Sequence, residues 1–81
     1  TKIFIEKVKM TINYQEEIKF ISNKIRELRK EKQMTVQELA YRCDMERSNM
    51  SRIESGRTNL TVKTMCIICN ALNVNLRDII R

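Results

Sequence analysis

The sequence has no proline, no histidine and no tryptophan, and its single glycine is Gly56. Sheets with many tight turns usually need more proline and glycine, so their scarcity favours a mostly helical fold. The absence of histidine removes the commonest general base and any Ser–His–Asp set, and the chain shows no glycine-rich phosphate loop. We therefore expect a binding protein and not an enzyme.

The cysteines are too few for a structural zinc site, which takes four ligands. Cys66 and Cys69 have the spacing of a redox or metal-binding pair, but Cys43 is the only further cysteine. Their segment is apolar, so we expect buried, inert thiols and predict no metal, cofactor or small-molecule ligand. The odd number of cysteines and the lack of a visible secretory signal predict a reduced, cytoplasmic protein.

Long apolar runs are also missing, since no stretch approaches the roughly 20 residues that span a bilayer. No membrane association is therefore expected.

The chain does have basic charge: its 81 residues carry a formal net charge of +6, with 42% apolar and 32% charged residues. This is the balance of one small globular domain. The charge permits binding to a polyanion, although a membrane, an acidic protein or plain solvation also fits it.

Residues 1–14 alternate in polarity with the period of a β-strand. We predict an N-terminal arm, residues 1–15, that carries this strand in front of a domain at residues 16–81. A lone strand is unstable in water, so the arm would pair, most simply with its copy in a second subunit. A frayed leader is the alternative. The apolar residues of one parity are Phe4, Val8, Met10, Ile12 and Tyr14.

Residues 16–32 change to a helical period, which predicts an amphipathic helix. Its apolar residues are Ile18, Ile21, Ile25 and Leu28. The basic exit of this helix, residues 29–32, complements the negative end of the helix dipole. These charges are either solvated or in contact with phosphate.

The stretch from Thr35 to Gly56 predicts two short helices joined by a tight turn. Thr35 with Glu38 three residues later is a capping box that starts the first helix. Asp44 suits the left-handed backbone of a turn, and Gly56 supplies the stop after the second helix. The second helix has an apolar back and a front of arginine, serine and asparagine, which suits the major groove of DNA.

A polar loop follows, and Thr61 begins a further helix that ends at Asn73. Asn75 with Asp78 is the expected cap of a last short helix. The total is five helices, so we predict an all-α fold.

Four pieces of residues 20–80 occur together, RELRKEK, T-x-x-E-L-A, S-R-I-E-S-G-R and C-N-A-L-N-V-N-L-x-D-I. In this order and spacing they resemble the XRE-type, lambda-repressor-like (Cro/CI-like) helix-turn-helix family. The resemblance implies a compact five-helix DNA-binding domain that acts as a homodimer and regulates transcription. Many members have glutamine after the capping threonine, glycine in the turn and proline after the loop asparagine. This chain departs from that pattern at Val36, Asp44 and Leu60.

The resemblance places the second helix at about residues 36–42 and the recognition helix at about residues 47–54. Side chains at the start of a recognition helix meet base edges, and arginine offers a fork that matches guanine O6 and N7. The predicted base-reading residues are Arg47, Ser48, Asn49 and Arg52. The predicted contacts to the DNA backbone are Thr35, Gln37, Ser51, Arg57, Thr58 and Asn59.

Two residues near this face have structural interpretations. Arg52 either reads a base or forms an ion pair with Glu46 or Glu38. Glu54 is acidic beside a DNA face, so we expect a structural ion pair with an arginine. The expected partners of Glu54 are Arg42 and Arg57.

We predict a sequence-specific, double-stranded DNA-binding transcriptional regulator that acts as a homodimer on a palindromic operator. Two recognition helices about 34 Å apart would match half-sites one turn apart. The alternative is a protein-interaction module, such as an antitoxin-like or mobile-element partner, whose DNA binding is secondary. An RNA reader ranks last, because such proteins stack bases on exposed aromatics and this chain has two Phe and two Tyr. A phage or mobile-element repressor and a restriction–modification controller both fit the prediction.

Overall fold

Residues 11–81 are described by the computed structural model, and they fold into four α-helices and one 3₁₀ turn. The elements are α2 (Tyr14–Glu31), α3 (Val36–Arg42), α4 (Arg47–Glu54), α5 (Val62–Leu72) and the 3₁₀ turn η1 (Leu76–Asp78). No strand occurs in this part of the chain, so the predicted all-α class is confirmed there. None of these helices is both long enough and apolar enough to cross a bilayer.

The prediction of a fifth helix is wrong, because the chain makes only a single 3₁₀ turn at η1. Both backbone hydrogen bonds of this turn span three residues, from Asp78 N to Asn75 O at 2.9 Å and from Ile79 N to Leu76 O at 3.1 Å. Asp78 does cap the turn as predicted, since its carboxylate accepts a hydrogen bond from Asn75 N at 2.8 Å. The turn ends where Ile79 inserts a fully buried side chain into the core.

The predicted strand of the N-terminal arm falls mainly on residues 1–10, which lie outside the described residues. Asn13 caps α2, because its side-chain oxygen accepts hydrogen bonds from Gln15 N at 2.9 Å and from Glu16 N at 3.3 Å. Helix α2 therefore begins at Tyr14 and not at residue 16. The division of the chain into an arm and a domain stays a prediction.

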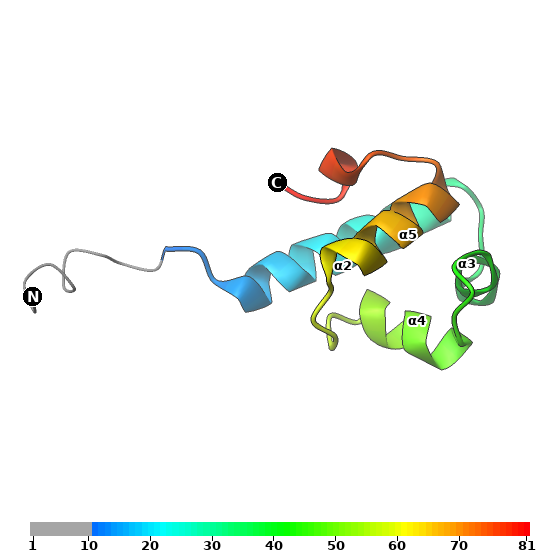
Figure 1. Cartoon of the computed structure of the whole chain (residues 1–81), viewed down its shortest axis with the longest axis horizontal. Coiled ribbons are helices and arrows are strands. Elements are labelled where there is room, and N and C mark those ends of the chain that lie inside the picture. The colour runs from blue at the N-terminus through cyan, green and yellow to red at the C-terminus, as the bar shows by residue number, and fades with distance from the viewer. Residues whose placement is uncertain (1–10) are drawn as a thin grey trace, which may run out of the picture.

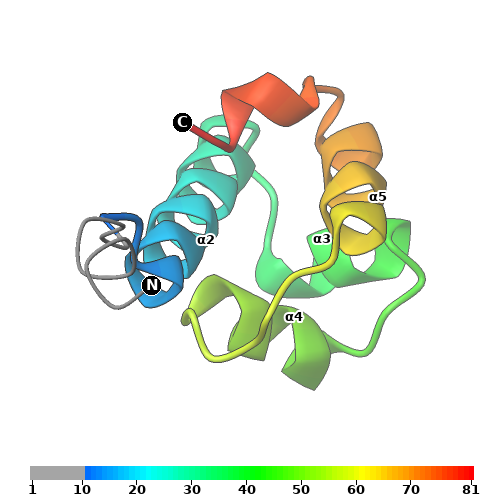
Figure 2. The same cartoon turned by 60° about the vertical axis from the view of Figure 1, so that its left-hand side comes forward.

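The core takes apolar side chains from every helix. Figure 1 shows α2 running behind α5, with α3 and α4 at the lower side, and Figure 2 separates α2 from α5 and shows α4 below both. Helix α4 packs against α2 and α3, while α5 packs against α2, α3 and η1. The core therefore fixes the orientation of α4 relative to α3. The fully buried apolar side chains are Ile25, Leu39, Met50, Ile53, Ile68, Leu72 and Ile79.

All four helices end in the same backbone motif, a residue of positive φ followed by a hydrogen bond across six residues. The φ angles are 58° at Gln33, 55° at Asp44, 76° at Gly56 and 57° at Asn73. Asp44 thus forms the predicted turn between α3 and α4, and Gly56 ends α4. The bonds run from Met34 N to Arg29 O, Met45 N to Ala40 O, Arg57 N to Arg52 O and Val74 N to Cys69 O, at 2.9–3.1 Å.

The expectation of buried thiols at Cys66 and Cys69 is confirmed for Cys69 only. Cys43 and Cys69 are buried, and this burial raises the pKa of both thiols. Cys66 is exposed, so its predicted burial is wrong: it lies on the side of α5 that faces away from the core residue Ile68. All three thiols are free, and residues 11–81 contain no cluster of three or more His, Cys, Asp or Glu suited to a metal ion.

Candidate nucleic-acid interface

Helix α4 has one buried side and one exposed side. Met50, Ile53 and Glu54 are buried, and every other residue of the helix is exposed. At 3.6 residues per turn, Ser48 and Arg52 point away from the buried row. The helix therefore has the predicted bounds, and all four predicted base-reading side chains are accessible to a ligand.

A buried ion pair fixes the last turn of α4. Glu54 accepts two hydrogen bonds from Arg29 of α2, from Nε at 2.7 Å and from Nη2 at 3.1 Å. Arg29 also donates from Nη1 to Met34 O at 2.7 Å, just before α3. Glu54 is structural as expected, but its partner is neither Arg42 nor Arg57. The expectation that Arg29 is solvated or meets phosphate is wrong, because its side chain is only 10% exposed.

The N-terminus of α3 presents Thr35 and Gln37. Thr35 caps the helix, since its Oγ1 accepts a hydrogen bond from Glu38 N at 3.0 Å. The reciprocal half of the predicted capping box is absent from the hydrogen bonds of residues 11–81, because the Glu38 carboxylate binds Arg42 at 3.1 Å instead. Val36 packs against the core, which explains an apolar residue at this position. Gln37 is the exposed amide of the first turn.

Three arginines of α4 and the loop after it carry no ion pair within the described residues. They are Arg47, Arg52 and Arg57. Glu38 is already held by Arg42, and Glu46 forms no salt bridge with any residue from 11 to 81, so the structural alternative for Arg52 finds no support. Unneutralised guanidinium groups on an exposed helix are available to an anionic or hydrogen-bonding ligand.

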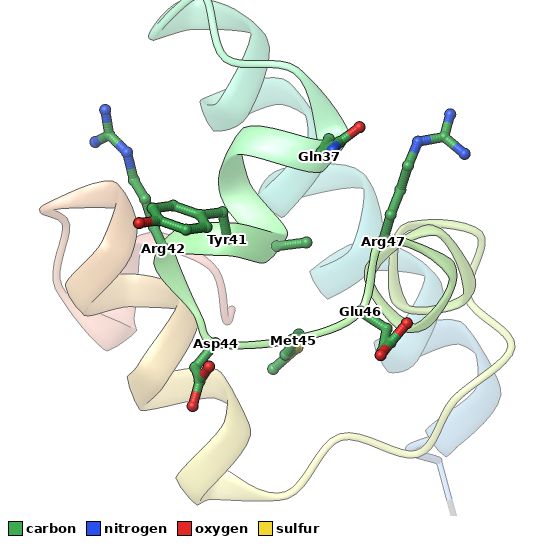
Figure 3. A pocket seen from close by; sticks show the side chains of 8 residues that line it. Gln37, Tyr41, Arg42, Asp44, Met45, Glu46 and Arg47 are labelled. Atoms are coloured by element: carbon green, nitrogen blue, oxygen red, sulfur yellow. The ribbon is translucent and has the colours of Figure 1, made fainter.

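An open hollow of about 820 Å³ lies in the elbow between α3 and α4. Figure 3 shows Gln37 and Arg47 projecting toward one edge of this hollow, while Asp44 and Glu46 point toward the opposite edge. The amide and the guanidinium are thereby kept apart from the two carboxylates. Tyr41, which is 84% exposed, also lines the hollow. Sequence reasoning did not assign Tyr41, although its spacing of four residues from Gln37 would have placed both on one face.

The loop after α4 continues the exposed polar surface. Gly56 reverses the chain, so Arg57 follows directly on the last turn of the helix, and both Arg57 and Asn59 are exposed. Thr58 is half-buried, whereas Ser51 on α4 is exposed. The predicted contacts to the DNA backbone thus lie on three segments: the start of α3, α4 itself and this loop.

Comparison with known proteins gives one family and one fold. The helix-turn-helix family model HTH_3 matches residues 25–79. Among solved structures, the wild-type restriction-modification controller protein C.Esp1396I is 33% identical, with 79% of this chain and 80% of that chain covered and a TM-score of 0.70.

Two further structures share the fold at lower identity. The restriction-modification controller protein C.AhdI from Aeromonas hydrophila is 24% identical, covers 76% of this chain and 94% of its own, and has a TM-score of 0.73. A hypothetical transcription factor, NHTF, from Neisseria is 22% identical, with 91% and 85% covered and a TM-score of 0.78. No curated protein sequence matches the chain.

Proposed function

This chain belongs to the HTH_3 (XRE-type) helix-turn-helix family of DNA-binding transcriptional regulators, which are not enzymes. We propose that it binds a specific double-stranded operator. Helix α4 lies in the major groove in this proposal. The supporting observation is the exposed side of α4, where Arg47 and Arg52 have no ion-pair partner among residues 11–81. The residues that meet base edges are Arg47, Ser48, Asn49 and Arg52.

Contacts to the sugar–phosphate backbone hold α4 in register without reading sequence. The free N–H groups at the start of α3, together with the helix dipole, favour a phosphate near Thr35 and Gln37. The loop after α4 supplies a guanidinium and polar side chains to a second phosphate. The complete set is Thr35, Gln37, Ser51, Arg57, Thr58 and Asn59.

The active form is a homodimer. A helix as short as α4 reaches only a few base pairs, so one copy cannot select a site in a genome. Two copies related by a two-fold axis would place their recognition helices about 34 Å apart and bind a palindrome with half-sites one turn apart. We propose that the protein needs no small-molecule ligand and acts in the cytoplasm.

Restriction–modification control is the role with the most specific support. The controller protein C.Esp1396I is 33% identical over 79% of this chain. Genome-wide mapping of bound sites tests this role. Binding upstream of a methyltransferase and endonuclease pair supports it, whereas sites confined to unrelated promoters contradict it.

Selection from a random-sequence duplex library tests the main proposal. The wild type should enrich an inverted repeat and bind it as two protomers per duplex in sedimentation. An Arg47→Ala/Arg52→Ala variant, whose substitutions leave the core untouched, should lose the enrichment. Weak binding that salt abolishes, with no sequence enriched, would instead identify a protein-interaction module with secondary DNA binding.

A further inference from the structure

A second hollow, of about 220 Å³, lies between α2 and the end of α4. Its α2 wall consists of Lys19, Ser22, Asn23 and Arg26, whose spacing of three and four residues puts them on one stripe of the helix. The α4 wall is formed by residues 54–56. None of the α2 residues belongs to the predicted DNA-binding set.

The hollow continues the exposed row of α4. Ser48, Arg52 and Ser55 follow one another at spacings of four and three residues, so they lie on one side of the helix and its C-cap. Ser55 is also part of the wall of the hollow, and its hydroxyl donates to Arg52 O at 2.9 Å. A duplex that lies along α4 therefore passes this hollow as it leaves the recognition helix.

The charge of the hollow is positive. Neither Lys19 nor Arg26 forms a salt bridge within residues 11–81. Arg26 Nη2 donates to Asn23 Oδ1 at 2.6 Å, which leaves the remaining guanidinium N–H groups and the Asn23 amide N–H groups free to donate. The only acid in the wall is Glu54, and both of its oxygens accept hydrogen bonds from Arg29.

The floor of the hollow holds an unpaired donor. Ser22 is 2% exposed, and its Oγ has no hydrogen-bond partner in residues 11–81. Buried hydroxyls are nearly always paired, so an unpaired one requires an explanation. Gly56 lies above it, and a Cβ at that position would stand 3.9 Å from Ser22 Oγ. Ser22 Oγ itself has almost no exposed surface, so the donors that line the open part of the hollow are those of Lys19, Asn23 and Arg26.

We propose that this hollow binds a backbone phosphate of the duplex, beyond the phosphates bound by α3 and the loop after α4. The inference rests on the proposed function, because it assumes a duplex along α4. The hollow offers N–H donors from three side chains, Lys19, Asn23 and Arg26, and no aromatic ring on which a base could stack, so it suits a phosphate and not a base. Helix α2 thereby adds to affinity and to the length of the DNA footprint, and not to sequence choice.

A Lys19→Gln/Arg26→Gln variant tests the inference against a matched control, Lys24→Gln/Arg77→Gln. Both variants remove one lysine and one arginine charge. Lys24 lies on another flank of α2 and Arg77 belongs to η1, which Figure 2 shows at the far end of the molecule from α4. The affinity for the selected duplex is measured as a function of salt, and ethylation interference identifies the phosphates that each protein needs.

The hollow variant should lose about 0.9 from the slope of log K against log salt, the contribution of one phosphate. It should also lose interference at one phosphate per half-site, while the enriched sequence stays unchanged. The control should keep the wild-type slope and interference pattern.

The outcomes separate this inference from the proposed function. If the wild type binds its selected palindrome, but the hollow variant and the control share its slope and interference pattern, α2 binds no phosphate and only the inference is overturned. If the wild type selects no duplex at all, the proposed function fails and the inference fails with it.

Discussion

Arg29 and Glu54 are 25 residues apart in the sequence, yet Arg29 Nε lies 2.7 Å from Glu54 Oε2 inside the protein. The third donor of Arg29, Nη1, binds Met34 O immediately before α3. One guanidinium therefore joins the end of α4 to the segment that leads into α3. The angle between α3 and α4 depends on this pair as well as on the apolar core.

Removing one member of this pair should destabilise the domain strongly. Arg29→Met leaves the Glu54 carboxylate buried without a partner, which should cost about 3–5 kcal/mol in the free energy of unfolding. Urea denaturation measures the loss. An Arg29→Met/Glu54→Leu double variant should recover most of it, because apolar pairs replace buried ion pairs at little net cost. A single-variant loss below about 1 kcal/mol, typical of exposed ion pairs, would show that the pair is not desolvated.

Two arginines beside each other on the surface should differ in what they contribute to DNA binding. Arg52→Ala should cost about 1–3 kcal/mol on the selected operator and relax the preference at one base pair of each half-site. Arg57→Ala should weaken binding to all sequences alike and lower the salt slope by about 1. Fluorescence anisotropy on the operator and on its single-base variants measures both effects. Equal relaxation of sequence preference by the two variants would show that Arg57 also reads bases.

The positive φ of Gln33 predicts a stabilising substitution. A left-handed residue with a side chain costs about 1–2 kcal/mol, and the extra unfolded-state freedom of glycine offsets about 0.5–1 kcal/mol, so Gln33→Gly should gain up to about 1.5 kcal/mol. Gln33 is exposed, so few contacts are lost. Thermal unfolding measures the gain. Gly56→Ala is the matched opposite, since it adds a side chain at a φ of 76° and should destabilise. A loss of stability in Gln33→Gly would mean that its side chain makes a contact in solution.

The three thiols should react unequally with a thiol reagent. Cys66 is exposed, whereas Cys43 and Cys69 are buried and have raised pKa values. The native protein should therefore show one fast-reacting thiol, and the denatured protein should show three. The two buried thiols should stay slow in mildly alkaline solution, because burial raises the pKa of both and their thiolates form only at higher pH. Cys66→Ser should abolish the fast phase, and a fast phase that persists would disprove the assignment.

Local signals were enough to predict helices α3 and α4. A capping threonine at Thr35 and a residue tolerant of left-handed backbone at Asp44 fix the bounds of α3 within a few residues. Gly56 does the same for the end of α4. Helix caps and left-handed turn residues depend only on neighbours within one helical turn, so they can be recognised from the local sequence.

Features set by contacts between distant segments were not predicted. Arg29 lies four residues after Ile25, on the buried stripe of α2, but a charged side chain is normally expected at the surface. Its burial depends on a carboxylate 25 residues away, which no local pattern reveals. The predicted last helix is only a 3₁₀ turn for a similar reason. It ends at Ile79, whose side chain is buried in a core formed by residues from all parts of the domain. The hollow that we propose as a phosphate site was not predicted either, because α2 and the end of α4, which form its walls, are far apart in the chain.

Methylation interference shows whether the exposed side of α4 reads base edges in the major groove. Methylation of guanine N7 modifies the major groove, whereas methylation of adenine N3 modifies the minor groove. N7 methylation within each half-site should block binding of the wild type, and Arg47→Ala or Arg52→Ala should remove the block at individual guanines. Interference confined to adenine N3, or an N7 pattern that neither substitution alters, would contradict base reading by α4.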